Sequence, residues 1–285
     1  MDKFKDELGT EGGPLQELEL LIASELSGVD EPIIRRAAAK LDFEFGPWRA
    51  GKDERREFAG KLLQADLERL PDALKELAKT SKFEDKAARN VIKHVLPFRI
   101  SALAVAALPG IATRRPAEQR SVFLCAHAPR TGELCVRRAW CGVESWIVVT
   151  PDGVSGEDDV AAMVSKIWGI FKRKHLMDET KSLAEVKSWV ERHLLKKRKE
   201  PLFIVLPEGV SAEVVAGVRE EFKGFTVIIL VGERATGDEI DLMNGAAHFL
   251  EPFREAADKG PPDEDPEQQV EDVYFELCSI LGRRS

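Results

Sequence analysis

Residues Arg120–Leu134 read RSVFLCAHAPRTGEL and carry the strongest fold signal in the chain. The apolar run Ser121–Cys125 is typical of a buried strand, and the segment Glu133–Trp140 is compatible with a helix. Strand, loop, glycine and helix in this order have the layout of a phosphate-binding P-loop, G-x-x-x-x-G-K-[ST]. The stretch therefore predicts a P-loop-like α/β domain with a parallel sheet.

The pattern is degenerate at the positions that bind nucleotide. Aligned on Gly132, it has His127 for the first glycine, Glu133 for the lysine and Leu134 for the Ser or Thr. In a working P-loop the lysine reaches the phosphates and the hydroxyl binds Mg²⁺. A carboxylate in place of the lysine would repel phosphate by about 4 kcal/mol at ~4 Å in an effective dielectric near 20. We therefore expect no nucleotide, metal or other cofactor at these residues.

Beyond residue 120, apolar strands alternate with amphipathic helices, which indicates a parallel sheet covered on both faces. The further strands are expected at Ser145–Val149, Leu202–Leu206, Phe225–Val231 and, as a short edge, Ala247–Leu250. Helices are expected after Ser155, Ser182 and Ser211 and over Asp238–Ala247. Ser182 and Glu185 form a capping box, the side-chain pattern that starts a helix.

Residues 14–109 have helical spacing and no convincing strand. Asp30 and Asp53 can cap helices, and Ser81–Glu84 has the capping-box pattern. We expect an all-α bundle in residues 1–112 and a linker at 113–119. The α/β domain then occupies residues 120–285, with an acidic linker and a last amphipathic helix at its end.

The charge is unevenly distributed along a chain of 285 residues with a net charge of −8. Residues 1–119 carry 20 basic and 21 acidic groups, whereas Glu251–Asp272 alone holds nine acids and two bases. Near-neutral folded parts argue against nucleic-acid binding. The N-terminus has no apolar signal core, and the apolar stretch Val91–Ala112 is too interrupted for a membrane span. A cytoplasmic protein without a membrane partner is expected.

Few residues offer other chemistry. No H-e-x-x-H or G-x-S-x-G pattern occurs, and the four cysteines form no C-x-x-C pair, so neither a metal site nor a disulfide is expected. Glu208 follows the third expected strand, where a catalytic acid could stand, and Arg234 follows the fourth, near the place of a phosphate sensor. A hydrolase that uses Cys125 or Cys141 with His127 is a further alternative.

From Arg120 to Leu250 the chain resembles the P-loop domain of STAND NTPases, signalling ATPases of immunity and programmed cell death. The matching pieces are VFLCAHAPRTGEL, SWIVVTPDG, AEVKSWVERHLLKKRKEPLFIVLPEG and FTVIILVGE. Without the lysine and the hydroxyl, the chain is most similar to the inactive STAND-like domains of bacterial conflict systems. With the right-handed crossover rule, the resemblance implies that strand 226–231 lies between strands 121–125 and 202–206.

The resemblance also implies a function. Inactive STAND-like domains often carry a small helical, death-fold-like effector-associated domain, and residues 14–109 are compatible with one. The leading hypothesis is a non-enzymatic adaptor in a bacterial defence or signalling complex. It would recruit a protein partner through the helical domain, or associate with a second copy of itself.

Two alternatives remain. One is a cryptic nucleotide-binding or hydrolysing enzyme that uses Glu208 and Arg234. The other is a regulatory subunit that binds its partner through the acidic tail and the last helix.

Overall fold

The computed structural model describes residues 14–46, 53–114, 116, 120–140, 147–151, 159–173, 182–198, 201–232, 248–253 and 265–282. The chain divides into two compact units. We call residues 1–101, 140–144 and 255–285 the helical unit, and residues 102–139 and 145–254 the α/β unit.

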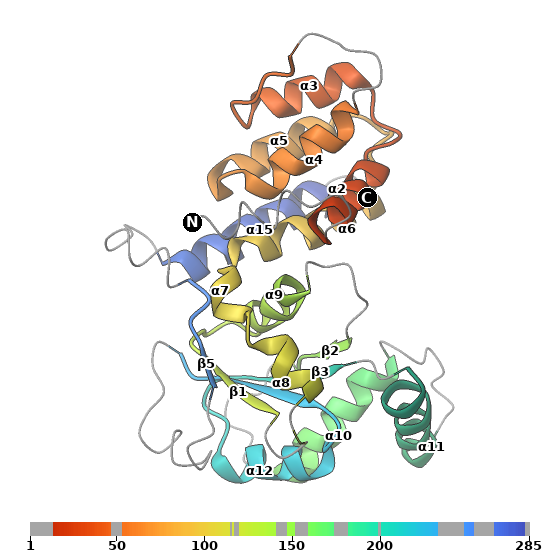
Figure 1. The fold of residues 1–285 in the computed structure, drawn as a ribbon, viewed down its shortest axis with the longest axis vertical. Helices are drawn as coiled ribbons and strands as arrows, with labels where there is room; N and C mark the ends of the chain where they lie inside the picture. The colour runs from red at the N-terminus through yellow and green to blue at the C-terminus, as the bar shows by residue number, and fades with distance from the viewer. Residues whose placement is uncertain are drawn as a thin grey trace. The chain divides into compact units, whose positions relative to one another are not determined.

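The described part of the helical unit contains helices and no strand (Figure 1). Its helices are α2 (Pro14–Glu25), α3 (Glu31–Ala39), α4 (Glu54–Gln64), α5 (Leu70–Ala78), α6 (Asp85–Val95) and α15 (Pro266–Gly282), with 3-10 turns at Leu67–Arg69 and Leu96–Arg99. Helix α2 packs against α4 and α6, and α3 packs against α5. Asp53 caps α4 as predicted, since its carboxylate accepts hydrogen bonds from the backbone N–H groups of Arg55 and Arg56.

Arg99 joins the second 3-10 turn to α4. Its guanidinium donates hydrogen bonds to the carbonyl oxygens of Leu62 and Leu63, at 3.2 and 3.3 Å. These carbonyls lie in the last turn of α4, where a helix leaves its C=O groups without partners of its own. Burial lowers the pKa of Arg99 to about 10, and the side chain still carries its charge at neutral pH.

The strands of the α/β unit are β1 (Ser121–Leu124), β2 (Ile147–Val149), β3 (Leu202–Leu206), β4 (Thr226–Leu230) and β5 (His248–Leu250). They form a five-stranded sheet in the order β2-β3-β4-β1-β5, and every pair is parallel. Strand β4 therefore lies between β1 and β3, which confirms the order predicted from the resemblance. Val122 lies beside Ile228 on one side of β4, and Ile204 lies beside Val227 on the other.

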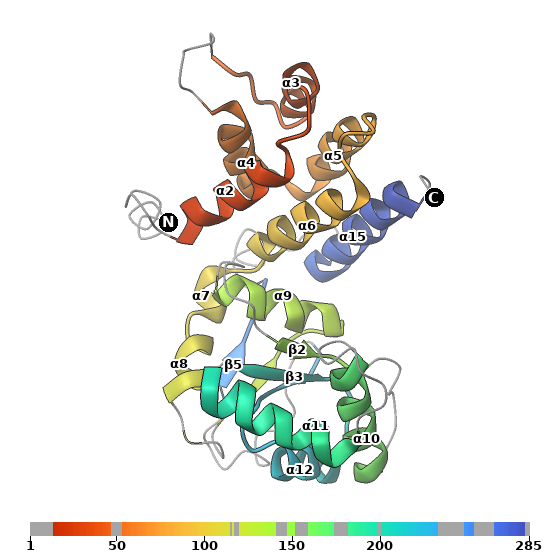
Figure 2. The same ribbon diagram turned by 90° about the vertical axis from the view of Figure 1, so that its right-hand side faces the viewer.

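The remaining helices cover both faces of the sheet (Figure 2). They are α7 (Ala102–Val105), α8 (Leu108–Arg114), α9 (Pro129–Ala139), α10 (Val160–Phe171), α11 (Leu183–Trp189), which continues into a π-helix at Val190–Arg198, and α12 (Ala212–Glu221). Helix α9 lies on one face, and α10 and α12 lie on the other. The strand side chains between them are buried, as the continuous apolar runs predict.

Several local predictions hold and others do not. Ser182 and Glu185 form the predicted capping box, and Ser211 accepts a hydrogen bond from the backbone of Val214. The capping box at Ser81–Glu84 is wrong, because α6 begins one residue after Glu84, whose side chain makes no capping bond. Ser155, Arg234 and the expected helix Asp238–Ala247 lie outside the described residues.

The observed units differ from the expected domain boundaries at both ends of the α/β part. Helix α8 continues to Arg114, and Ile111 and Ala112 are buried, so the chain is helical where we expected the linker at 113–119 to begin. The change of unit falls after Ser101 instead. The C-terminal helix α15 packs against α5 and α6 of the helical unit, although its sequence neighbours suggested the α/β domain.

Among the described residues, no single helix is long and apolar enough to cross a membrane. Only the bent pair Asp85–Arg99 and Ala102–Arg114 reaches that length and apolarity when the two are taken together.

Glu76 supplies a test of pH dependence in the helical unit. It is 4% exposed and accepts hydrogen bonds from Lys79 and from Arg36 Nε, the latter at 2.7 Å. These bonds, the one from Lys79 most strongly, lower the pKa of Glu76. The stabilisation is therefore complete above the unfolded-state pKa of about 4.3 and is lost as the pH falls through the folded-state value.

We expect E76Q to reduce the free energy of unfolding by about 1 kcal/mol at pH 7, because both basic partners are exposed and the bonds are partly screened. Urea unfolding at pH 7 and pH 3 measures the change, and the difference between the two proteins should shrink at pH 3. Exposed Glu31, which pairs with Arg35 at 2.9 Å, provides the control variant E31Q with a smaller effect. A loss of the same size at both pH values would contradict the ion-pair explanation.

Gly132 supplies a packing test in the α/β unit. It lies in α9, and a Cβ atom at this position would come within 2.6 Å of Val205 Cγ1 on β3. Gly169 in α10 has only an ordinary contact, 3.7 Å from Arg173 Nη1. In a helix, Gly→Ala normally stabilises by about 1 kcal/mol.

We therefore expect G169A to stabilise the fold and G132A to destabilise it by about 1 to 3 kcal/mol through overpacking. In a double-mutant cycle, G132A should cost less when Val205 is also changed to Ala, since V205A removes the colliding methyl groups. Urea unfolding of the four proteins measures the cycle. Purely additive effects would show that Gly132 has another role.

Candidate functional site at the carboxyl edge of the sheet

The connection from β1 to α9 is short and tied to both neighbouring strands. Strand β1 ends at Leu124 and α9 begins at Pro129, so Cys125–Ala128 is the whole loop. The N–H of Gly232, after β4, donates to the carbonyl of Ala126 at 3.2 Å. The N–H of Cys125 donates to the carbonyl of Leu250 in β5 at 3.0 Å. These bonds hold the loop against the carboxyl ends of β4 and β5.

Helix α9 begins earlier than the sequence suggested, and this changes the role of the aligned P-loop positions. We expected a helix from Glu133, whereas Pro129 occupies the first turn, where its missing N–H costs nothing. Gly132 is thus a helix residue that lets α9 approach β3, and Leu134 is buried at 6% exposure. Glu133 accepts a hydrogen bond from Arg137 at 3.1 Å, one helical turn away. The anticipated repulsion between Glu133 and a phosphate therefore does not describe this helix.

His127 is the aligned position that lies at the sheet edge, and it pairs with Glu208. The distance between His127 Nδ1 and Glu208 Oε2 is 2.7 Å. Glu208 follows β3, so the pair joins the ends of two strands that β4 separates. The side chains are 53% and 46% exposed, and the pair is accessible from solvent.

Gly232 makes this pair geometrically feasible. Its φ is +63°, in the left-handed region that favours glycine. A Cβ atom there would come within 2.5 Å of Glu208 Oε1 and 3.0 Å of His127 Cε1. The absence of a side chain after β4 thus lets the imidazole and the carboxylate meet across that strand. Sequence reasoning missed Gly232; its position directly after a buried strand was the available signal.

The pair has a definite chemical capacity. When the Glu208 carboxylate accepts the proton of Nδ1, it holds the imidazole in the tautomer whose Nε2 can accept a proton. The sequence associated Glu208 with Arg234, which is outside the described residues, so that association stays a prediction. Among the described residues, Glu208 pairs with His127. Among the described residues, no three His, Cys, Asp or Glu side chains come together as a metal site.

The cysteines do not strengthen the site. Cys125, Cys135 and Cys278 are free thiols, and Cys141 lies outside the described residues. Cys125 is partly buried and packs against the core of the α/β unit. The alternative of a hydrolase that uses Cys125 or Cys141 with His127 stays a prediction.

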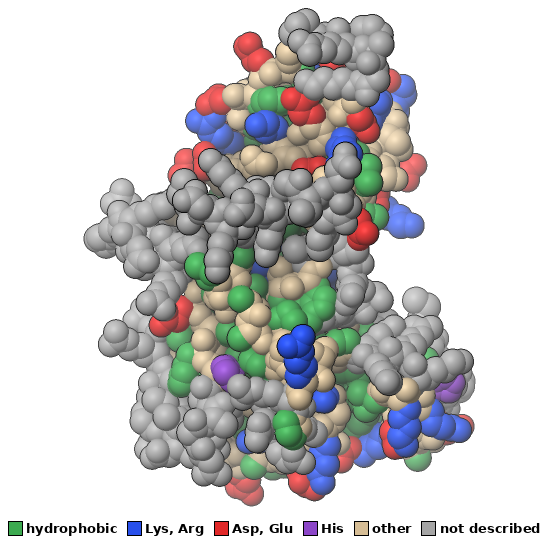
Figure 3. All heavy atoms as spheres, in the orientation of Figure 1, with side chains coloured by type: hydrophobic (Ala, Val, Ile, Leu, Met, Phe, Trp, Pro, Cys, Tyr) green, Lys and Arg blue, Asp and Glu red, His purple; other side chains and the backbone are tan. Residues whose placement is uncertain are grey.

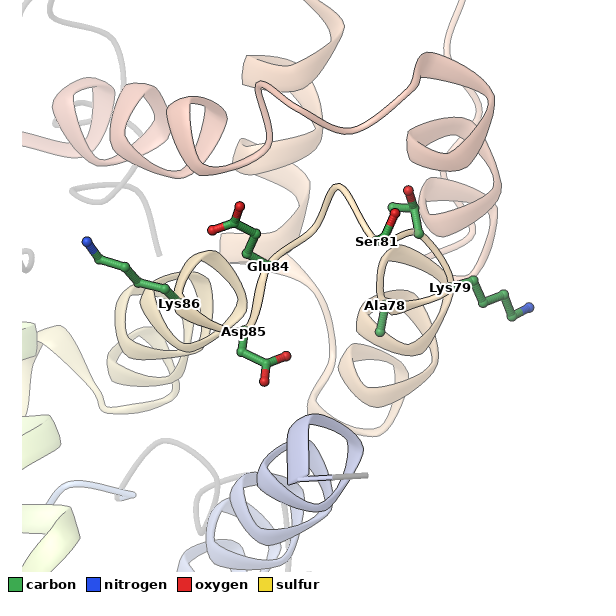
Figure 4. A pocket seen from close by; sticks show the side chains of 7 residues that line it. Ala78, Lys79, Ser81, Glu84, Asp85 and Lys86 are labelled. Carbon is green, nitrogen blue, oxygen red and sulfur yellow. The ribbon is translucent and has the colours of Figure 1, made fainter. Parts of the chain in front are cut away.

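A second concave surface lies in the helical unit, at the connection from α5 to α6 (Figure 4). The hollow has a volume of about 640 Å³ and is lined by Ala78, Lys79, Thr80, Ser81, Glu84, Asp85 and Lys86. The side chains of Lys79 and Lys86 point away from each other on opposite sides of it. Two acids and two bases in the lining make it mixed in charge, which does not select an anion or a cation.

Replacement of Gly232 tests the geometry of the site. Gly209 also has a positive φ, +78°, but a Cβ atom there would have no atom within 4 Å, so G209A is a matched control. Both variants should lose about 1 to 2 kcal/mol of stability from the left-handed backbone. Only G232A should also separate His127 from Glu208, which a crystal structure of each variant would show. An unchanged 2.7 Å contact in G232A would contradict the role assigned to Gly232.

Comparison with known proteins identifies no relative of the chain. No protein-family model, no curated protein and no solved structure matches the chain.

Proposed function

We propose that the chain is a non-enzymatic adaptor or regulatory protein of a bacterial defence or signalling complex, and that its helical unit recruits a protein partner. The connection Cys125–Ala128 is the observation that carries this proposal. A P-loop works through backbone N–H groups that surround the phosphates and a lysine that reaches them. Here the loop has no lysine, His127 is turned to Glu208, and the glycine of the aligned pattern lies against Val205.

The arrangement of the sheet supports an origin in the resembled family. Strand β4 lies between β1 and β3, as the STAND-like resemblance implies, while the loop after β1 lacks the groups that would bind nucleotide. A fold with this strand order but without a phosphate-binding loop can still serve as a scaffold for protein contacts, which favours an adaptor over a nucleotide-hydrolysing enzyme. We propose, on the same resemblance, a cytoplasmic protein of antiviral defence.

The surface of the helical unit supports a protein partner. Acidic and basic side chains alternate on its visible face (Figure 3). Pairs such as Lys82–Asp30, at 2.8 Å, and Arg35–Glu31, at 2.9 Å, place opposite charges side by side. Mixed charge favours docking on a complementary protein surface, or on a second copy, and gives no basic stripe for nucleic acid.

One observation favours the enzyme alternative. The His127–Glu208 pair is solvent-accessible at the carboxyl edge of a parallel sheet, where ligands of open α/β folds bind. An imidazole held by a carboxylate could act as a general base. The enzyme is the second candidate because the loop that carries His127 lacks the lysine and the hydroxyl of a working P-loop.

Nucleotide titration tests the leading proposal. Isothermal titration of the full chain with Mg²⁺-ATP and Mg²⁺-GTP should show no binding in the micromolar range. We expect nucleotide binding to be absent for a geometric reason as well as a chemical one. Helix α9 begins at Pro129, so Gly132 lies inside the helix and not in the loop. The triple variant H127G/E133K/L134S, which restores the residue types of the pattern, should therefore also fail to bind.

The two titrations separate the explanations. Micromolar binding by the unmodified chain would overturn the adaptor proposal and favour the enzyme. Binding by the triple variant alone would show that residue identity, and not the start of α9, is what prevents nucleotide binding.

A further inference from the structure

Helix α15 is seated on the helical unit by one face. Val270 and Leu277 are 1% and 2% exposed, and their spacing of seven residues places them two turns apart on the same side. Phe275, in contrast, is 59% exposed. The N–H of Glu267 donates to the Asp265 carboxylate at 3.0 Å, so the helix carries its own N-terminal cap. It has the character of an amphipathic helix that lies in a groove.

The groove belongs to the first hundred residues of the chain. Helix α15 contacts α5 and α6 and the two 3-10 turns beside them. At one wall, Lys75 Nζ of α5 lies 2.6 Å from Glu276 Oε1. The hydrogen bond from Lys75 to Glu276 raises the pKa of Lys75.

Charge complementarity is found on the α6 side of the contact. Residues 266–282 contain four acids and no lysine or arginine. Helix α6, with the sequence DKAARNVIKHV, contains one acid, three bases and a histidine. Helix α5 is mixed, with Asp72, Lys75 and Glu76, and Lys75 is the residue that pairs with α15. An acidic helix is therefore favoured over a basic competitor along α6 and at Lys75.

The anchoring of α15 differs from that of the helices that form the groove. In α5, six of nine residues are buried, Glu76 among them. In the described side chains of α15, the buried apolar residues are Val270 and Leu277. A reversible helix-in-groove ligand likewise uses a few apolar anchors together with charged contacts at the rim.

We propose that the α5–α6 groove is the partner-binding surface of the helical unit and that α15 is its displaceable intramolecular occupant. This inference rests on the adaptor function proposed above. The partner it fits is an acidic amphipathic helix of another protein. That helix would carry two apolar residues seven positions apart and an acid that pairs with Lys75. Partner binding then requires α15 to leave the groove.

Binding of a peptide with the sequence of α15 to the full chain tests whether the α5–α6 groove is a binding surface that α15 occupies. The probe is a fluorescein-labelled peptide of residues 265–282, followed by fluorescence anisotropy, with a scrambled peptide as the control ligand. The receptors are the unmodified chain and the full-length variant V270D/L277D, whose own α15 cannot occupy the groove. We expect the variant to bind the peptide at least about tenfold more tightly than the unmodified chain, since competition in cis is removed.

A charge-reversal series locates the peptide in the groove. In the V270D/L277D background, K75E should weaken binding about tenfold, and a peptide carrying E276K should restore it. Lys82, which pairs with Asp30 at 2.8 Å, provides the matched control K82E with no effect. The milder full-length variant E276K keeps both apolar anchors and should bind the unmodified peptide with intermediate affinity.

Three kinds of result would overturn the proposal, and a fourth would separate it from the adaptor function. Loss of helical circular dichroism in V270D/L277D would make α15 an integral part of the core. Equal binding by both receptors, or no binding by the folded variants V270D/L277D and E276K, would show that the groove is not a receptor. Light scattering that finds a dimer dissociated by V270D/L277D would assign the groove to a second copy. If the peptide binds as expected and the full chain also binds ATP, the groove would still be a peptide-binding surface, and only the adaptor function would be overturned.

Discussion

The close approach of α9 to β3 at Gly132 is the contact on which the α/β unit depends. Because a methyl group at Gly132 would come within 2.6 Å of Val205, the helix backbone must lie directly on the strand. This approach places Gly132 inside the helix and leaves only Cys125–Ala128 to connect β1 with α9. This loop donates a hydrogen bond to the end of β5 and accepts one from Gly232 after β4. One packing constraint thus determines the helix start, the loop and the shape of the sheet edge.

The sheet could be predicted from the sequence because its signals are local. Strand β3 occupies Leu202–Leu206 as predicted, and the capping box at Ser182 requires residues only three positions apart. The same pattern failed at Ser81: with Ser81 as the N-cap the helix would begin at Lys82, but α6 begins at Asp85. The position of α15 was the least predictable from sequence, because the helices that it packs against lie almost two hundred positions earlier in the chain.

The candidate site was predictable in its parts and not as a whole. Glu208 was identified from its place after the third strand, and His127 from its place in the loop after the first. Their pairing depends on two facts that a sequence does not display. Strand β4 lies between their strands, and Gly232, two residues after β4, has a left-handed backbone conformation that favours glycine and no side chain to fill the space. Two residues 81 positions apart therefore meet because a third residue has no side chain.

The helical unit is formed by both ends of the chain, with the α/β unit as an insertion between them. This connectivity makes the C-terminal helix a part of the helical unit. Val270 and Leu277 of α15 are buried within the same chain. These two side chains are therefore not available to another protein while the helix is seated. A helical fragment that ends near residue 112, as the domain prediction suggested, would lack α15 and leave its seat on α5 and α6 uncovered. Under the proposed mechanism, the same covalent arrangement would let one element act in two ways: α15 completes the helical unit when seated, and its departure would uncover the surface of α5 and α6 that bears Lys75.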